Sequence, residues 1–166
     1  MSYEPGLVPD SGSLRLYLQE ELGKIAAAIN DMFERVTLYT PAWTATADPS
    51  LGNGELSGWY ARAGRLCHGG IRLVMGSTTT YGTGTWGFSL PFPPALDVPE
   101  FHIGSVARLR DDTANVNFIG AGRISNNSAL DLAILAEGAE FVASAIPFTW
   151  AQDDQLFVSF TYMAER

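Results

Sequence analysis

Hydrophobic and polar positions divide the chain into three parts with different periodicity. Residues 1–12 show no periodicity and contain two prolines and two glycines, which disfavours both a helix and a buried strand. Residues 13–36 repeat apolar side chains every three or four positions, and residues 37–166 contain several runs with a period of two. We therefore expect an extended N-terminal arm over 1–12, a helix over 13–36 and a β domain over 37–166.

The expected helix carries the spacing of a coiled-coil core, with Ser13 as its N-cap. β-Branched residues at both core positions favour three strands over two. An amphipathic helix packed on its own domain shows similar spacing, so both interpretations stay open. A helix this short is not expected to hold a trimer without help from the β domain. In the coiled-coil interpretation, the trimer interface consists of Leu18, Leu22, Ile25, Ile29, Met32 and Val36.

The β domain is expected to be an antiparallel β-sandwich of the jelly-roll type. Its strands recur at short intervals and are separated by glycine- and asparagine-containing turns. Asn53-Gly54 is expected to form a tight hairpin turn with positive φ. The expected strands cover residues 55–62, 66–75, 86–92, 103–110, 116–124, 130–135 and 156–162, with another near Phe148.

Composition and charge narrow the function classes. Charged residues make up 17% of the chain, below the usual value of about 25%, which suggests that part of the surface meets other protein. The net charge of −8 disfavours binding to a phosphate backbone, so no nucleic-acid partner is expected. No apolar run is long enough to span a bilayer, and the first residues do not resemble a signal peptide, so no membrane partner is expected.

Candidate catalytic and metal-binding groups are few. Cys67 is the single cysteine, which excludes an internal disulfide, and the histidines are His68 and His102. Neither metal-ligand spacing nor a nucleophile–base pattern surrounds them. The acid pairs Asp111-Asp112 and Asp153-Asp154 fall at expected turns, where aspartate hydrogen-bonds locally. We expect no enzymatic activity, no metal and no cofactor.

The large aromatic residues allow two interpretations. They can line a sugar-binding site, or they can fill the core and the subunit contacts of a β domain, which is the more usual role. Those considered for a glycan site are Trp43, Trp59, Trp86, Trp150, Tyr60 and Tyr81.

Two segments of the β domain resemble a module of tailed-phage structural proteins. They are Leu51-Gly52-Asn53-Gly54 and Met75-Gly76-Ser77-Thr78-Thr79-Thr80-Tyr81-Gly82. This module occurs in head decoration or head-fibre proteins and in minor tail or fibre proteins. The opening of the chain, from Tyr3 to Pro9, also resembles the N-termini of short phage appendage proteins.

The resemblance implies a homotrimeric decoration (cement or head-fibre) protein that stabilises the assembled capsid. Such a protein is made in the host cytoplasm and resides on the capsid exterior of the virion. In that setting the arm would bind the major capsid protein. The alternative is a tail-fibre or minor tail adhesin that binds a host surface receptor or glycan. The residues expected to bind the capsid are Tyr3, Pro5, Leu7, Val8 and Pro9.

Overall fold

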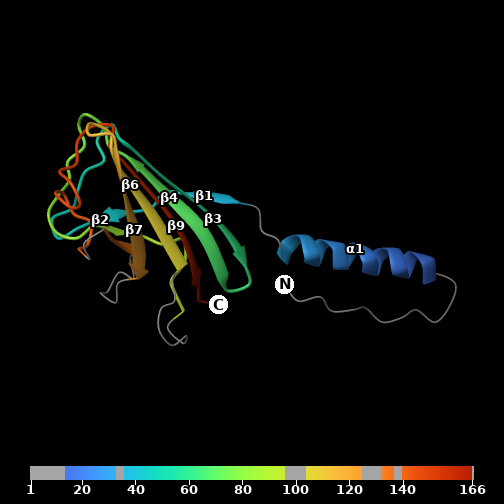
Figure 1. Cartoon of the computed structure of the whole chain (residues 1–166). Helices are drawn as coiled ribbons and strands as arrows, with labels where there is room; N and C mark the ends of the chain where they lie inside the picture. Colours follow the sequence, from blue (N-terminus) through green and yellow to red (C-terminus); the bar gives the residue numbers. More distant parts are fainter. Residues whose placement is uncertain (1–13, 33–35, 96–103, 125–131, 137–139, 166) are drawn as a thin grey trace.

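The computed structural model describes residues 14–32, 36–95, 104–124, 132–136 and 140–165. This part of the chain forms one α-helix followed by strands (Figure 1). In chain order the elements are α1 (Leu14–Met32), β1 (Thr37–Tyr39), β2 (Trp43–Thr44), β3 (Glu55–Ala63), β4 (Leu66–Val74), β5 (Gly87–Phe88), β6 (Gly104–Asp111), β7 (Val116–Ile124), β8 (Leu132–Leu135) and β9 (Gln155–Met163).

All strands belong to a single curled antiparallel sheet. Its order is β1-β3-β4-β9-β6-β7-β8-β5-β2, and every pairing is antiparallel. The last strand, β9, lies between β4 and β6 in the interior of the sheet. The expectation of a mainly β, antiparallel fold is confirmed. A jelly-roll sandwich is not confirmed, because one continuous sheet curls around its own core.

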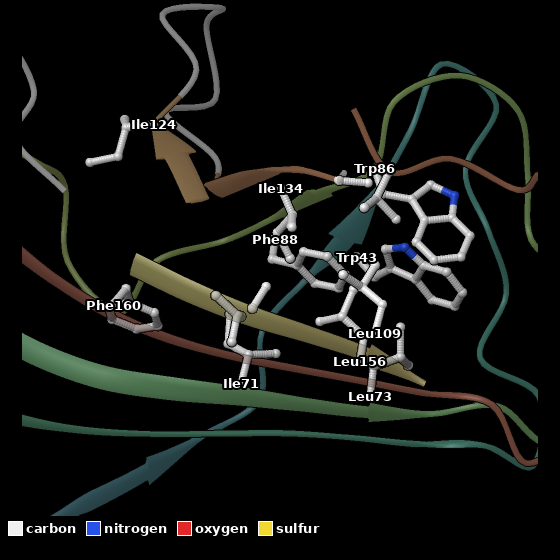
Figure 2. Packing of buried hydrophobic residues seen from close by; sticks show 14 of the residues in the cluster. Trp43, Ile71, Leu73, Trp86, Phe88, Leu109, Ile124, Ile134, Leu156 and Phe160 are labelled. Carbon is white, nitrogen blue, oxygen red and sulfur yellow. The ribbon is translucent and has the colours of Figure 1, made fainter. Parts of the chain in front are cut away.

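The curling brings the inner faces of distant strands together around an aromatic cluster (Figure 2). Trp43 on β2 meets Trp86 edge to face at 4.8 Å and stacks on Phe88 of β5 at 6.4 Å. The opposite side of the core is supplied by β4, β6 and β9, with Leu73, Leu109, Leu156 and other apolar residues buried against the aromatic groups. Packing of this kind explains why every second residue of β9, and most of those of β4, is buried.

The helix is shorter than expected. It is described over Leu14–Met32, residues 33–35 lie outside the described residues, and Val36 is not helical but stands directly before β1. The reason is that Thr37–Tyr39 pairs with β3 through Thr37↔Tyr60 and Tyr39↔Gly58, so the backbone is already extended there. Val36 is 61% exposed. The prediction that Val36 occupies a core position of a helical heptad is therefore wrong. The expected N-cap, Ser13, lies outside the described residues.

Long strands agree with their expected ranges, and so does β8 over its described residues Leu132–Leu135, but the run 86–92 and the strand near Phe148 do not. β3, β4, β7 and β9 match within one or two residues. The run 86–92 forms only the two-residue β5, although Trp86 and Phe88 do point into the core as the alternation predicted. Phe148 lies in no strand. Asn53-Gly54 does lie in a tight turn, closed by a hydrogen bond from the Gly54 N–H to the Leu51 carbonyl at 2.9 Å, but the positive φ of 57° is at Gly52. This turn lies between β2 and β3, which do not pair with each other, so it is not a hairpin turn.

The two segments that carried the family resemblance lie side by side. The Asn53 side-chain carbonyl accepts hydrogen bonds from the Thr78 backbone N–H and hydroxyl, both at 2.9 Å. The Thr79 hydroxyl donates to the Leu51 carbonyl at 2.7 Å and accepts from the Gly76 N–H at 2.8 Å. The glycine- and threonine-rich motif is thus a hydrogen-bonded pair of loops at one end of the sheet, which is a structural role.

Candidate interaction surfaces

The expected heptad residues of α1 form an apolar stripe that no described strand covers. Leu18, Leu22 and Ile29 expose 49%, 63% and 48% of their surface, and Ile25 is half-buried. Figure 1 shows α1 apart from the sheet, so the alternative of a helix packed on its own β domain is not seen. The stripe is therefore open to a partner.

The polar side of α1 is stabilised by local ion pairs. The Lys24 ammonium lies 2.8 Å from the Glu21 carboxylate and 3.4 Å from that of Glu20. The hydrogen bond to Glu21 raises the pKa of Lys24 above its usual value, with attraction from both glutamates adding to it. The pair with Glu20 is exposed and contributes little to stability, whereas the Glu21 side chain is buried.

A second surface lies on the outer face of the sheet, which points away from the core. There a shallow groove of about 460 Å³ crosses β1, β3, β4, β9 and β6. We call its outward side chains, together with the adjacent Ile119, the groove face. Its members are Leu38, Ser57, Trp59, Gly70, Arg72, Val106, Arg108, Ile119, Phe157 and Ser159.

The register of the strands sets the groove face in two rows. The first row runs from Leu38 through Trp59, Gly70 and Ser159 to Val106, each residue opposite the next on the neighbouring strand. Antiparallel partners on one face are close enough for their side chains to interact. The row therefore has bulky apolar residues at its ends and small residues in the middle, and this difference creates the groove.

The second row contains both charge and an aromatic platform. Arg72, Phe157, Arg108 and Ile119 are opposite one another on β4, β9, β6 and β7. The guanidinium of Arg108 lies 4.6 Å from the centre of the Phe157 ring, and that of Arg72 lies 5.9 Å from it. Cation–π contacts of this kind hold both arginines over the ring.

The two arginines differ in their charge partners. Arg72 forms an ion pair with Glu55 at 2.7 Å. No carboxylate pairs with Arg108 in the described part of the chain. The groove face thus presents one guanidinium whose charge is not neutralised by the described residues of its own chain.

Gly70 is required for the groove to exist. A Cβ atom added there would lie 2.7 Å from the indole nitrogen of Trp59. The Trp59 ring therefore lies where a side chain at position 70 would be. The same ring meets the His68 ring edge to face, with 5.3 Å between the ring centres. Glycine at this position lets the indole lie along the sheet, and it leaves the floor of the groove open.

Large aliphatic side chains surround the groove without cover from described residues. Leu38 is 81% exposed, Ile119 71% and Val106 63%. Single exposed aliphatic residues are ordinary, but several on one face mark an interaction surface.

Most of the other aromatic residues singled out in the sequence lie in or beside the hydrophobic core. Trp43, Trp86 and Trp150 are buried in the core, so they are not available to a glycan. Tyr60 and Tyr81 are half-buried at its margin. Trp59 alone among the four tryptophans belongs to the groove face. The arm residues Tyr3, Pro5, Leu7, Val8 and Pro9 lie outside the described residues.

The cysteine and histidine residues form no catalytic arrangement in the described part of the chain. Cys67 is buried against Tyr162, and burial raises the pKa of the Tyr162 hydroxyl, which donates to the Phe92 carbonyl at 2.8 Å. His68 hydrogen-bonds to the Thr161 hydroxyl at 2.8 Å. His102 lies outside the described residues. No group of three or more potential metal ligands occurs among the residues described. The described helix is not long and apolar enough to cross a bilayer.

The groove face was not predicted from the sequence, although β9 carried a signal for it. Leu156, Phe157 and Val158 are consecutive apolar residues, so one of them must point away from the core. A strand with apolar residues on both faces is typical of coverage on both sides. The remaining members come from four other strands, and only the strand register unites them.

Comparison with known proteins links the chain to phage tail fibres. No protein-family model matches it, and no solved structure matches it. Over 112 residues, or 68% of its length, the chain is 32% identical to the Mu-like prophage FluMu defective tail fiber protein of Haemophilus influenzae. The matched region spans 18% of that relative. The similarity gives no support to the narrower decoration subtype; it supports a structural protein of the phage tail-fibre type.

Proposed function

We propose that this chain is a non-enzymatic, homotrimeric structural protein of the phage tail-fibre type, with α1 as a short stem and the curled sheet as a head. The observation that carries this proposal is the 112-residue similarity to a protein named as a tail fibre protein. On this proposal the chain is part of the virion, and the head is the part that meets a host surface receptor or glycan.

The exposed stripe of α1 supports the proposed trimer. Burying Leu18, Leu22, Ile25 and Ile29 against two other helices removes these side chains from water, at roughly 25 cal/mol for each Å² of apolar surface. β-Branched residues at Ile25 and Ile29 supply both types of core position, which favours three helices. The stripe is short once Val36 is excluded, so the heads must add to the association.

A capsid decoration role is the second candidate, with the arm bound to the major capsid protein. The length of α1 favours it. Nineteen helical residues span only about 28 Å, which is little for a shaft that must hold a receptor-binding head away from a particle. A decoration protein would stabilise the assembled shell by its binding free energy, since it binds only the assembled lattice.

The test compares wild-type particles with particles that lack this protein. For the tail-fibre type, we expect adsorption to host cells to fall while the resistance of heads to heat is unchanged. Adding the purified protein during assembly should restore adsorption. Normal adsorption with DNA loss at lower temperature would instead establish the decoration role, and unchanged behaviour in both assays would contradict both candidates.

A further inference from the structure

We propose that the groove face is a contact between copies of this chain, so that three heads as well as three helices hold the trimer together. This inference rests on the proposed trimer and adds the surface and residues by which the heads associate.

The exposure of the groove face is what a subunit contact requires. Leu38, Val106 and Ile119 leave most of their surface open to water in the single chain. Phe157 and Trp59 add aromatic area between them. Cores of subunit interfaces are rich in aromatic and aliphatic residues and in arginine, and poor in lysine and acidic residues. The groove face has this composition, with Glu55 present only as the partner of Arg72.

The connection to α1 places the groove face near the partner copies. Leu38 follows the last helical residue, Met32, by six positions, which limits their separation to about 20 Å. Packed helices lie about 8–10 Å apart. In a trimer built on α1, the three β1 strands therefore begin within about 20 Å of the packed helices, which keeps the three heads next to one another. Leu38 stands on β1, at one end of the groove face.

Exposed apolar residues occur on the stem and again where the β domain begins. Leu18, Leu22 and Ile29 are exposed on α1, and Val36 and Leu38, directly before and within β1, are 61% and 81% exposed. The apolar surface of the proposed helix interface and that of the groove face therefore lie near the two ends of one short connection.

The charge of Arg108 also fits a second copy of this chain. Its guanidinium lacks a carboxylate partner among the described residues, while the chain as a whole carries a net charge of −8. In a threefold assembly a face need not contact its own equivalent, because the contacts are heterologous. An acidic residue elsewhere on the next copy can then pair with Arg108. We therefore expect the association to weaken as salt is raised.

An acidic polysaccharide is the other ligand that Arg108, Trp59 and Phe157 could bind. The aliphatic rim argues against it. Sugars stack on the flat faces of aromatic rings, whereas Leu38, Val106 and Ile119 offer no such face and remain costly to expose. A protein surface covers all three at once.

The test uses two valines of the β6–β7 hairpin in the full-length chain. Val106 points outward on the groove face, whereas Val116, opposite Asp111, lies on the other face and is 43% exposed. Val106→Glu places a charge in the proposed contact, and Val116→Glu places the same charge away from it. Both side chains are partly open to water in the single chain, so both variants should fold.

We expect wild type and Val116→Glu to be trimers by light scattering, and Val106→Glu to associate on the order of a hundredfold more weakly or to be monomeric. Ile119→Glu should behave like Val106→Glu. It takes the place of that variant in the test if near-ultraviolet circular dichroism shows that Val106→Glu is misfolded. A monomeric wild type would refute the trimer itself. A trimeric wild type with both groove-face variants still trimeric would refute only the head contact. Binding of polygalacturonate to wild type and not to Val106→Glu, with the trimer unchanged, would assign the face to an acidic polysaccharide instead.

Discussion

Asp154 shows how one buried carboxylate joins two distant loops. It is completely buried, and its two oxygens accept hydrogen bonds from the backbone N–H groups of Ala151 at 2.6 Å and Asp112 at 2.8 Å. The second bond connects the β6–β7 turn to the loop before β9. The acid pairs were predicted to lie at turns and to hydrogen-bond locally. The bond to Ala151 is of that kind, but the bond to Asp112 spans 42 positions.

Replacing Asp154 by alanine should destabilise the head by about 2–4 kcal/mol, because a buried side chain and its two hydrogen bonds to backbone N–H groups are lost. Urea denaturation monitored by tryptophan fluorescence measures this change. Asp112→Ala is the matched control. It removes an exposed carboxylate that pairs with Arg110 at 3.0 Å, and it should change the free energy of unfolding by less than about 0.5 kcal/mol. Equal effects of the two substitutions would contradict this role of Asp154.

Asp154 also predicts an unusual dependence on pH. Burial raises the pKa of its carboxyl above the ordinary value, although the two backbone hydrogen bonds act in the opposite direction. The folded protein therefore binds this proton more tightly than the unfolded chain does. This contribution to stability is present below the unfolded pKa and is lost as pH rises through the folded one.

The stability of wild type relative to Asp154→Asn should therefore increase as pH is lowered from neutral towards 4. The asparagine does not titrate but keeps one acceptor oxygen. Urea midpoints of both proteins, measured across this range, give the difference. A difference that stays constant or shrinks on acidification would mean that the hydrogen bonds outweigh burial.

At the scale of elements, the predictability of each strand depended on its length and on its neighbours. β4 and β9 could be predicted because nine residues of alternation leave little ambiguity. β1 and β2 could not, since segments of three and two residues carry no period and form only through pairing with β3 and β5. β1 also explains the error at Val36, because pairing of the next residues ended the helical pattern that the spacing alone would have continued.

The groove face could not be predicted from the sequence, for a related reason. Its residue types are visible in the sequence, but no local pattern joins Trp59, Arg72 and Phe157. Their adjacency follows from cross-strand register. The floor of the groove lies over Gly70, which has no side chain. A glycine within a strand can serve several structural purposes, so Gly70 alone did not indicate a groove.

The stem allows a test of its own with two substitutions on one helix. Ile25→Asp should convert the trimer to monomers or prevent solubility, because an unpaired charge would be buried among three helices. Ala27→Asp, on an exposed position outside the stripe, adds the same charge to the same helix and should leave the trimer intact, although it costs more helix propensity than Ile25→Asp does. Analytical ultracentrifugation measures both. A trimeric Ile25→Asp protein would refute the helical interface.

At the scale of the whole molecule, attachment and folding are expected to be separate properties. Deleting residues 1–12 should leave a folded trimer with an unchanged melting temperature, because the paired strands of the sheet lie between Thr37 and Met163. The same deletion should abolish attachment to particles, since Tyr3, Leu7 and Val8 are the proposed anchors. Co-sedimentation with particles that lack the protein measures attachment. Full attachment of the shortened protein would exclude the arm as the anchor.

The position of β9 fixes an order of events during synthesis. The β3–β4 and β6–β7 hairpins can each form from neighbouring residues, but in the described sheet β4 and β6 are joined through β9, which is synthesised after both of them. Until then two incomplete half-sheets expose unpaired edges, and pairings between distant residues form slowly. α1, which is made first and needs only local hydrogen bonds, can meet other copies while the heads are still unfinished. Nascent chains on one messenger would thus be gathered by their stems before any head has closed.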